Sequence, residues 1–256
     1  MSARRPTRRT HRPGADQRMS ARFQELDWRQ TPLGELTLRR RCDPSSGKEI
    51  HEIKLNDEFL MSSMFTVAEV ELARLALAEV AQEPLHVVVG GLGLGYTAHS
   101  VLEHPNIGSL LVVDALNEVI EWHRQGLIPG GKALAADRRC RLVHGDFFAM
   151  LRSGQGFDPA TPGRLFDAII VDIDHSPRHL LHPSNADFYQ PEGLRRLAGL
   201  LHPGGVFALW SNDPPDDEFT AAMSSIFTEV RTEVVSFPNP LQNRDSGNTV
   251  YLAKLG

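Results

Sequence analysis

The sequence predicts an α/β fold built on a doubly wound, mostly parallel sheet, with a terminal antiparallel hairpin and a short β-hairpin element in front. After Pro84, apolar runs of strand length alternate with amphipathic stretches of helix length. The first of these strands runs into a glycine-rich turn, and the chain ends in two strands joined by a loop rich in Pro, Asn and Gly. We therefore expect one buried sheet with helices on both faces.

The expected strands of the sheet are apolar almost throughout, as is typical of strands buried on both faces. They span Leu85–Val89, Leu110–Val113, Arg141–Val143, Phe166–Val171 and Val206–Trp210. Glu229–Phe237 and Thr249–Lys254 are expected to form the terminal hairpin, and Ser153–Gly163 a surface loop. Together these elements predict one large domain over residues 66–256.

Two segments precede this domain. Residues 1–22 contain many Arg, Pro, Ser and Thr and almost no apolar side chains, so we expect a disordered basic tail. Residues 23–65 contain short β-like runs around a turn and are expected to form a small β element. Because Met1–Arg4 recurs as Met19–Arg22, the tail is either a functional basic arm or an extension upstream of the true start.

Thr66 and Glu69 open the first expected helix, which runs to about Ala81. A threonine followed three residues later by a glutamate is typical of a capping box, in which each side chain accepts a backbone N–H at the helix start. This interpretation gives Glu69 a role in the helix terminus.

Charge is divided unevenly along the chain. The formal net charge is −5, but residues 1–22 contain seven arginines and one acid, Asp16, so the remainder is more acidic than the total suggests. Nucleic-acid binding needs a basic surface, so we expect no nucleic-acid partner and favour a cationic small ligand.

Cysteine usage and hydropathy indicate the compartment. Cys42 and Cys140 are far apart and have no C-x-x-C companion, which argues against a disulfide framework and a structural zinc site. No stretch approaches the roughly 18 apolar residues of a membrane helix, and the basic N-terminus lacks the apolar region of a signal peptide. We expect a soluble, cytoplasmic protein with no membrane partner.

The glycine turn follows the first strand of the sheet and precedes a helix. Glycines allow positive φ and a close approach of the backbone to a ligand, and the helix N-terminus offers free N–H groups. We expect Gly91, Gly93 and Gly95 to bind a cofactor, and Asp114, at the end of the second strand, to hold ribose hydroxyls. A dinucleotide and S-adenosylmethionine (AdoMet) both fit these residues.

Acids after two further strands favour AdoMet. Gly145-Asp146 follows the third strand, where AdoMet enzymes use a carboxylate to accept from the adenine amino group. Asp172 and Asp174 follow the fourth strand, at the edge where open α/β sheets place their chemistry. The alternative is that these aspartates cap helices. Three acidic strand ends in register behind a glycine turn favour a Rossmann-like domain of the AdoMet type over a dehydrogenase.

Histidines follow the same strand. His175, His179 and His182 lie near the two acids, but two prolines break the helix that would align them, and no thiolate partner is present. We therefore expect no metal, and a loop over the substrate. His175 and Tyr189 are candidate substrate contacts.

The order and spacing of these motifs resemble the spermidine synthase (polyamine aminopropyltransferase) family over about residues 57–254. The segments that carry the likeness are Asp57-Glu-Phe59, Val88–Gly95, Asp114–Ile120, Gly145-Asp146, Ile170-Val-Asp172, Phe188-Tyr189, Leu201-His-Pro-Gly-Gly205 and Ser236-Phe-Pro238. The resemblance implies the class I methyltransferase fold, commonly as a homodimer. It also implies transfer of an aminopropyl group from decarboxylated AdoMet to a diamine.

This chemistry assigns roles to the acids. A neutral amine must attack the carbon beside a sulfonium, so the site needs a carboxylate to take the proton of the amine. Asp172 is the candidate base, and Asp174 would assist it or orient the small amine substrate. Asp114 and Asp146 would hold the ribose and adenine of decarboxylated AdoMet or AdoMet.

Departures from the family pattern gather at positions that would hold the amine. Gly93 stands where the family turn usually has an aspartate, Met61-Ser62 replaces Tyr-His, and an expected glutamine falls near Glu52. Two alternatives therefore stay open. One is an AdoMet-dependent small-molecule methyltransferase, and the other is a non-catalytic protein resembling the same family.

Overall fold

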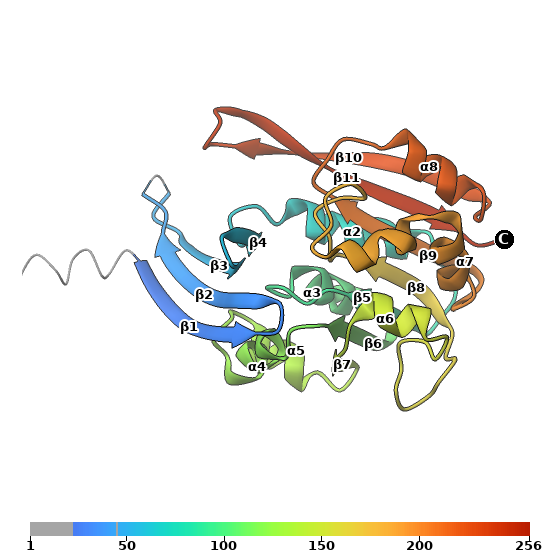
Figure 1. Cartoon of the computed structure of the whole chain (residues 1–256), viewed down its shortest axis with the longest axis horizontal. Helices are drawn as coiled ribbons and strands as arrows, with labels where there is room; N and C mark the ends of the chain where they lie inside the picture. Colours follow the sequence, from blue (N-terminus) through green and yellow to red (C-terminus); the bar gives the residue numbers. More distant parts are fainter. Residues whose placement is uncertain (1–22, 45) are drawn as a thin grey trace, which may run out of the picture. The chain divides into compact units, whose positions relative to one another are not determined.

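The structure is a computed structural model that describes residues 23–44 and 46–256. The prediction of a disordered basic tail over residues 1–22 lies outside the described residues. The chain divides into two compact units, and the boundary between them falls after Leu60 (Figure 1).

The first unit contains a four-stranded antiparallel sheet in the order β1-β2-β3-β4. Its strands are β1 (Phe23–Thr31), β2 (Gly34–Cys42), β3 (Glu49–Leu55) and β4 (Glu58–Ser62), and the last two residues of β4, Met61 and Ser62, already belong to the second unit. The predicted β-hairpin corresponds to β2 and β3. The observed sheet is larger, because β1 and β4 pair on either side of them. Nearly all of β1 is exposed or half-buried, so no apolar face marks it in the sequence.

Glu52, which stands near the position where the family pattern has a glutamine, belongs to an ion-pair cluster in β2 and β3. Glu52 is buried and accepts from the guanidinium groups of Arg39 at 2.7 Å and Arg41 at 2.8 Å. Both cations come from β2, so two opposite charges already compensate the Glu52 carboxylate.

The second unit contains a seven-stranded sheet in the order β10-β11-β9-β8-β5-β6-β7. Its strands are β5 (Leu85–Gly90), β6 (Ile107–Asp114), β7 (Cys140–His144), β8 (Phe166–Val171), β9 (Leu201–Ser211), β10 (Glu229–Asn239) and β11 (Arg244–Lys254). Strands β5 to β9 pair in parallel, while β10 and β11 form a long antiparallel hairpin at one edge (Figure 1). The predicted fold class is confirmed.

Helices pack on both faces of this sheet. They are α2 (Val67–Ala78), α3 (Tyr96–Glu103), α4 (Asn117–Gln125), α5 (Gly131–Ala136), α6 (Phe147–Arg152), α7 (Pro191–Ala198) and α8 (Asp217–Ser224), with a 3₁₀ turn, η1 (Pro183–Tyr189). An aromatic core joins α6, α7 and α8 to alternate residues of the strands, among them Val171 and Leu209. On the opposite face, α2 packs against α3, β8 and β9. None of the helices in the described residues is long and apolar enough to cross a membrane.

The strand order reverses between β5 and β8. The chain runs outward from β5 to β6 and β7, and then returns to place β8 on the other side of β5. Ligands of open α/β sheets bind at such a switch point, beyond the carboxyl ends of the strands. The two strand ends are joined directly, because the Asp172 N–H donates to the Gly90 carbonyl at 2.8 Å. The fold thus places the glycine turn beside Asp172.

The segment between α6 and β8 is anchored in the core, so the prediction of a surface loop over Ser153–Gly163 is wrong for its middle. Phe157 is fully buried, and its ring stacks on Phe147 with centroids 4.1 Å apart. The neighbouring Asp158 is also buried and pairs with Arg141 and Arg164. A short polar and glycine-rich sequence does not reveal such long-range partners.

Candidate active site

The glycine turn between β5 and α3 has a backbone that other residues adopt only with strain. Gly91, Gly93 and Gly95 have φ values of +95°, +46° and +89°. A Cβ on Gly91 would lie 2.0 Å from the Asp172 carbonyl oxygen, and one on Gly95 would lie 2.8 Å from His123 Cε1. Gly91 therefore allows the ends of β5 and β8 to approach each other, and Gly95 allows the start of α3 to pack.

Met61 lies against the middle of the turn. The Leu94 N–H donates to Met61 Sδ at 3.2 Å, and a Cβ on Gly93 would lie 2.9 Å from the same sulfur. Met61 and Gly93 are two of the positions at which the chain departs from the spermidine synthase pattern. These departures are therefore in contact, and the thioether occupies space that a side chain at position 93 would need.

Asp114, at the end of β6, fastens the turn. Its Oδ2 accepts from the Leu92 N–H and its Oδ1 from the Leu116 N–H, both at 2.8 Å. Burial raises the pKa of Asp114, while hydrogen bonds from the backbone of Leu116, Leu92 and Gly93 oppose that rise. The carboxylate predicted to hold ribose thus also positions the turn on which a nucleoside would lie.

Gly145 and Asp146 lie at the end of β7. The Gly145 N–H donates to the Asp114 carbonyl at 2.9 Å, which ties this strand end to that of β6. Asp146 is exposed and is the N-cap of α6, where its Oδ1 accepts from the Ala149 N–H at 3.0 Å. The helix-cap alternative therefore describes Asp146 in the structure, and its role toward adenine stays a prediction.

Asp172 directly follows β8, beside the glycine turn. Its Oδ2 accepts from the Thr97 hydroxyl at 2.7 Å, and Thr97 lies in the first turn of α3. Burial raises the pKa of Asp172 to about 6, and the hydrogen bond from Thr97 opposes that rise. A carboxylate with such a pKa is ionised at neutral pH and still a better base than an exposed aspartate.

Glu69 is an acid of this site that we did not predict from the sequence. The capping-box interpretation is wrong, because the Thr66 side chain makes no hydrogen bond at the start of α2. Glu69 is 8% exposed, and burial together with the charge of Asp172 raises its pKa to about 8. The first turn of α2 therefore brings a second carboxyl group into the electrostatic field of Asp172.

Asp174 and Tyr189 are brought together, but as a closed group. The Asp174 carboxylate accepts from the Tyr189 hydroxyl at 2.8 Å, the Leu181 N–H at 2.7 Å and the Asn185 amide at 3.0 Å. Both predicted residues are buried, and burial raises the pKa of each. The arrangement ties η1 to the end of β8, and any contact of either residue with an amine stays a prediction.

The histidines of the loop after β8 are held by neighbouring polar groups. His175 is half-buried, and its carbonyl accepts from the Asn212 N–H at 2.7 Å. His179 Nδ1 lies 2.8 Å from Asp213 Oδ2, which also accepts from the Ser176 hydroxyl at 2.6 Å. Within residues 23–44 and 46–256, no group of three or more His, Cys, Asp or Glu side chains could hold a metal ion.

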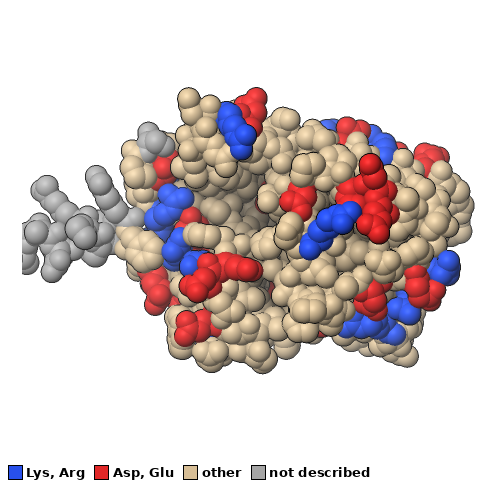
Figure 2. Space-filling model, turned by 45° about the horizontal axis from the view of Figure 1, so that its top comes forward, with Lys and Arg blue, Asp and Glu red and all other residues tan. Residues whose placement is uncertain are grey.

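Charged side chains at the surface mostly stand beside an opposite charge. On the face drawn in Figure 2, acidic and basic groups lie in small mixed clusters. The ion pairs of the described residues include Arg74 with Glu71 and Arg178 with Glu218. Asp172 and Glu69 differ from these surface acids, because neither belongs to an ion pair within the described part of the chain.

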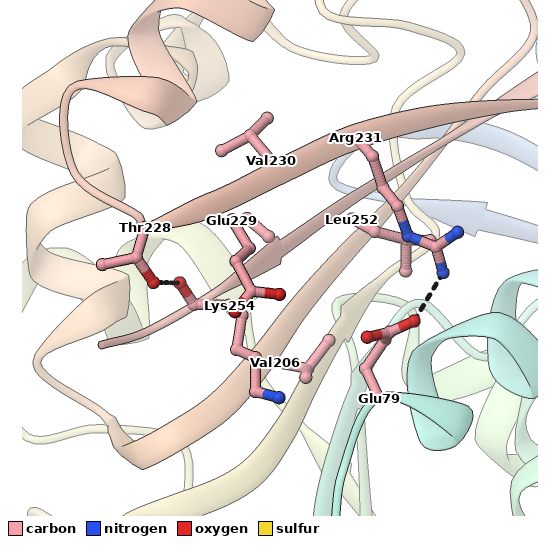
Figure 3. A pocket seen from close by; sticks show the side chains of 9 residues that line it. Glu79, Val206, Thr228, Glu229, Val230, Arg231, Leu252 and Lys254 are labelled. Atoms are coloured by element: carbon pink, nitrogen blue, oxygen red, sulfur yellow. Dashed lines mark hydrogen bonds and ion pairs between the residues drawn. The ribbon is translucent and has the colours of Figure 1, made fainter.

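A pocket of about 340 Å³ lies elsewhere in the second unit (Figure 3). It is lined by Val206 in the middle of β9, by the first residues of β10 and by the last residues of β11, and the ion pair between Arg231 and Glu79, at 2.7 Å, also lines it. Val206 lines this pocket and pairs with Ala168 near the amino end of the parallel strand β8, whereas Asp172 follows the carboxyl end of that strand. The pocket therefore lies toward the amino end of β8, away from the candidate site.

The sequence matches a family described as "Spermine/spermidine synthase domain" over residues 69–239. It is similar to polyamine aminopropyltransferase 2 of Pseudomonas aeruginosa, with 29% identity over 171 residues, 63% of this chain and 45% of that protein. It is also similar to putrescine N-methyltransferase 2 of Nicotiana attenuata, with 28% identity over 135 residues, 53% of this chain and 33% of that protein. The chain spans less than half the length of these curated relatives.

Among solved structures, the fold is similar to that of a spermidine synthase in complex with the transition state analogue AdoDATO. The TM-score is 0.68 with 20% sequence identity, over 92% of this chain and 74% of that chain. At this identity the likeness shows the fold alone.

Proposed function

The chain belongs to the spermine/spermidine synthase family, and from this we propose that it is a transferase that moves an alkyl group from a sulfonium nucleoside to a small amine. The donor would be decarboxylated AdoMet or AdoMet. The observation that carries the proposal is the carboxylate of Asp172, which lies at the switch point of the sheet, beside the glycine turn, with a pKa raised to about 6.

The residues around the turn fit a nucleoside. Asp114 offers two carboxylate oxygens with about four acceptor positions, of which the backbone N–H groups of Leu92, Gly93 and Leu116 take up three. About one acceptor position therefore remains for a ribose hydroxyl. The bound donor supplies a carbon atom that the positive charge on sulfur makes electrophilic.

Asp172 would remove the proton that prevents the amine from reacting. The amine nitrogen forms a bond to the carbon beside sulfur, the carbon–sulfur bond breaks, and its electron pair stays on sulfur. An ammonium has no lone pair for this attack, so its proton passes to Asp172 first. Thr97 donates to Oδ2 of Asp172, which leaves Oδ1 as the oxygen to accept that proton.

Methyl transfer from AdoMet is a second candidate. It is favoured by the likeness to putrescine N-methyltransferase 2 and by Gly93, which supplies no carboxylate where the family turn usually has an aspartate. Aminopropyl and methyl transfer share the same displacement and the same need for a base. They differ in the donor, which carries a carboxylate in AdoMet and none in its decarboxylated form.

The donor can be identified by calorimetry with the purified full chain. We expect micromolar binding of AdoMet or of decarboxylated AdoMet, and formation of an alkylated product when putrescine is added. Preference for decarboxylated AdoMet would assign aminopropyl transfer, and preference for AdoMet would assign methyl transfer. A folded protein that binds neither nucleoside would contradict the proposal and support a non-catalytic member of the family.

A further inference from the structure

We propose that Glu69 is an acceptor-binding residue, and that its carboxylate and that of Asp172 together hold the ammonium group of a small alkyl amine. The inference rests on the proposed function, because it adds a second residue to the same site and names the chemical class that the pair recognises. It assigns a ligand-binding role to a residue whose sequence context indicates only a helix start.

Glu69 is a nearly buried acid that has no cationic partner within the described part of the chain. It is 8% exposed, and no Lys, Arg or His within residues 23–44 and 46–256 forms an ion pair with it. Among the described residues, the hydrogen bond to its carboxylate comes from its own backbone N–H, at the N-terminus of α2. Buried carboxyl groups are almost always paired, so an ammonium from a ligand is the missing partner that this site predicts.

The position of α2 directs Glu69 toward the catalytic edge of the sheet. The helix packs on α3 and on β8, and α3 carries the Thr97 that holds Asp172. The charge of Asp172 acts on Glu69, and the charge of Glu69 acts on Tyr96 in the first turn of α3. Glu69 is therefore electrostatically coupled to Asp172 and to Tyr96.

Trp210 lies on the same face at the end of the neighbouring strand. The parallel register pairs Val171 with Leu209, so the next residues, Asp172 and Trp210, lie side by side. Trp210 Nε1 is buried and has no hydrogen-bond partner in the described part of the chain. An indole ring next to Asp172 suits an alkylammonium, because its face attracts a cation and its N–H can donate to the amine once the proton has left.

Binding of an ammonium to Glu69 and Asp172 should be coupled to the release of a proton. Burial and mutual repulsion raise the pKa of Glu69 to about 8, and burial raises that of Asp172 to about 6. At pH 7 the pair therefore holds about one proton. An ammonium that enters takes the place of this proton, which passes to the solvent. Amine binding should release up to about one proton for each molecule bound.

Calorimetry of the full chain tests this coupling without any turnover. Putrescine is titrated at pH 7 in two buffers of different ionisation enthalpy, with and without S-adenosylhomocysteine. For the wild-type protein we expect release of close to one proton per putrescine. For Glu69→Gln we expect affinity for putrescine to fall by at least about tenfold and proton release to approach zero, because the remaining Asp172 is already ionised.

Glu71→Gln is the matched control. Glu71 lies two residues further along α2, where it pairs with Arg74 at the surface. The same change from acid to amide in the same helix should leave putrescine affinity and proton release unchanged. Thermal melting of both variants verifies that α2 remains folded.

The outcomes separate this inference from the proposed function. Wild-type affinity for putrescine in Glu69→Gln, or a wild-type protein that binds S-adenosylhomocysteine but no putrescine at millimolar concentration, overturns the role of Glu69. Loss of putrescine binding in both glutamine variants overturns it as well. If putrescine binding and proton release are as expected but the protein binds no nucleoside, the amine site is supported and the proposed transferase function is contradicted.

Discussion

Asp114 and Asp172 are aspartates at the ends of the two strands that flank β5, and their carboxylates have different surroundings. Asp114 ends β6 and Asp172 follows β8, and burial raises the pKa of both. Asp114 accepts from the backbone of Leu92, Gly93 and Leu116 and thereby holds the glycine turn. Asp172 accepts one hydroxyl and lies in the field of a second acid, Glu69.

Because of this difference, we expect Asp114 to contribute to the stability of the fold and Asp172 to the reaction. The charge of Asp114 satisfies buried donors, so its removal leaves those donors without partners. The charge of Asp172 adds to that of another buried carboxyl group, so its removal relieves repulsion. We therefore expect loss of the acid to destabilise the fold at position 114 and to affect mainly the reaction at position 172.

The largest effect is expected from Asp172→Asn. Loss of the base should reduce transfer from the donor to putrescine by about 100-fold to 10,000-fold, with the melting temperature unchanged or raised. In the wild-type protein, transfer should increase as the pH rises through about 6, where Asp172 loses its proton. Product formation measured by mass spectrometry checks both, and full turnover by the variant would remove Asp172 from the mechanism.

The next effect is expected from Asp114→Ala. The N–H groups of Leu92 and Leu116 would lose their acceptor, which should lower the free energy of unfolding by about 2–5 kcal/mol. Urea denaturation measures the change, and nucleoside affinity should fall with it because the turn loosens. An unchanged unfolding midpoint would show that Asp114 does not fasten the turn.

A pH-dependent gain in stability is expected from Glu69→Gln. Glu69 has a pKa of about 8 in the fold and about 4.5 when exposed, so the folded state binds more protons between these pH values. Wild-type stability should therefore fall as the pH rises from 5 to 8. The glutamine variant should lose most of this slope and be about 2–4 kcal/mol more stable than the wild type at pH 8. Parallel slopes in the two proteins would show that Glu69 is not a buried acid.

The smallest effect is expected from Asp146→Ala. This change removes one exposed N-cap hydrogen bond, from the Ala149 N–H, and should cost about 1 kcal/mol in the free energy of unfolding. Nucleoside affinity, measured on the same variant, decides whether Asp146 does more than cap α6. Affinity equal to the wild type would leave it a cap alone.

The sequence predicts the buried sheet well because its strands are buried on both faces. Phe166–Val171 was expected and found with the same bounds, and the run from Leu85 is one residue longer than predicted. Such runs are recognised by composition alone. The outer strands β1 and β4 were missed, since exposed strands of mixed polarity carry no such pattern.

Candidate site residues could be predicted from the sequence where they belong to a motif that is local along the chain. They could not be predicted where their place in the site depends on the packing of helices. The glycine turn and the strand-end acids follow from local order along the chain. Glu69 does not, because the spacing of Thr66 and Glu69 is the same in a capping box and in a helix start that buries its acid. Only the packing of α2 on α3 and β8 distinguishes the two.

The contact between Met61 and Gly93 couples two departures from the family pattern. A Cβ at position 93 would lie 2.9 Å from Met61 Sδ, so an aspartate there would require the flexible thioether to move. The same sulfur accepts from the Leu94 N–H, and this hydrogen bond would be lost when the side chain moves away. Restoring the aspartate of the family pattern would therefore also change how residue 61 holds the turn.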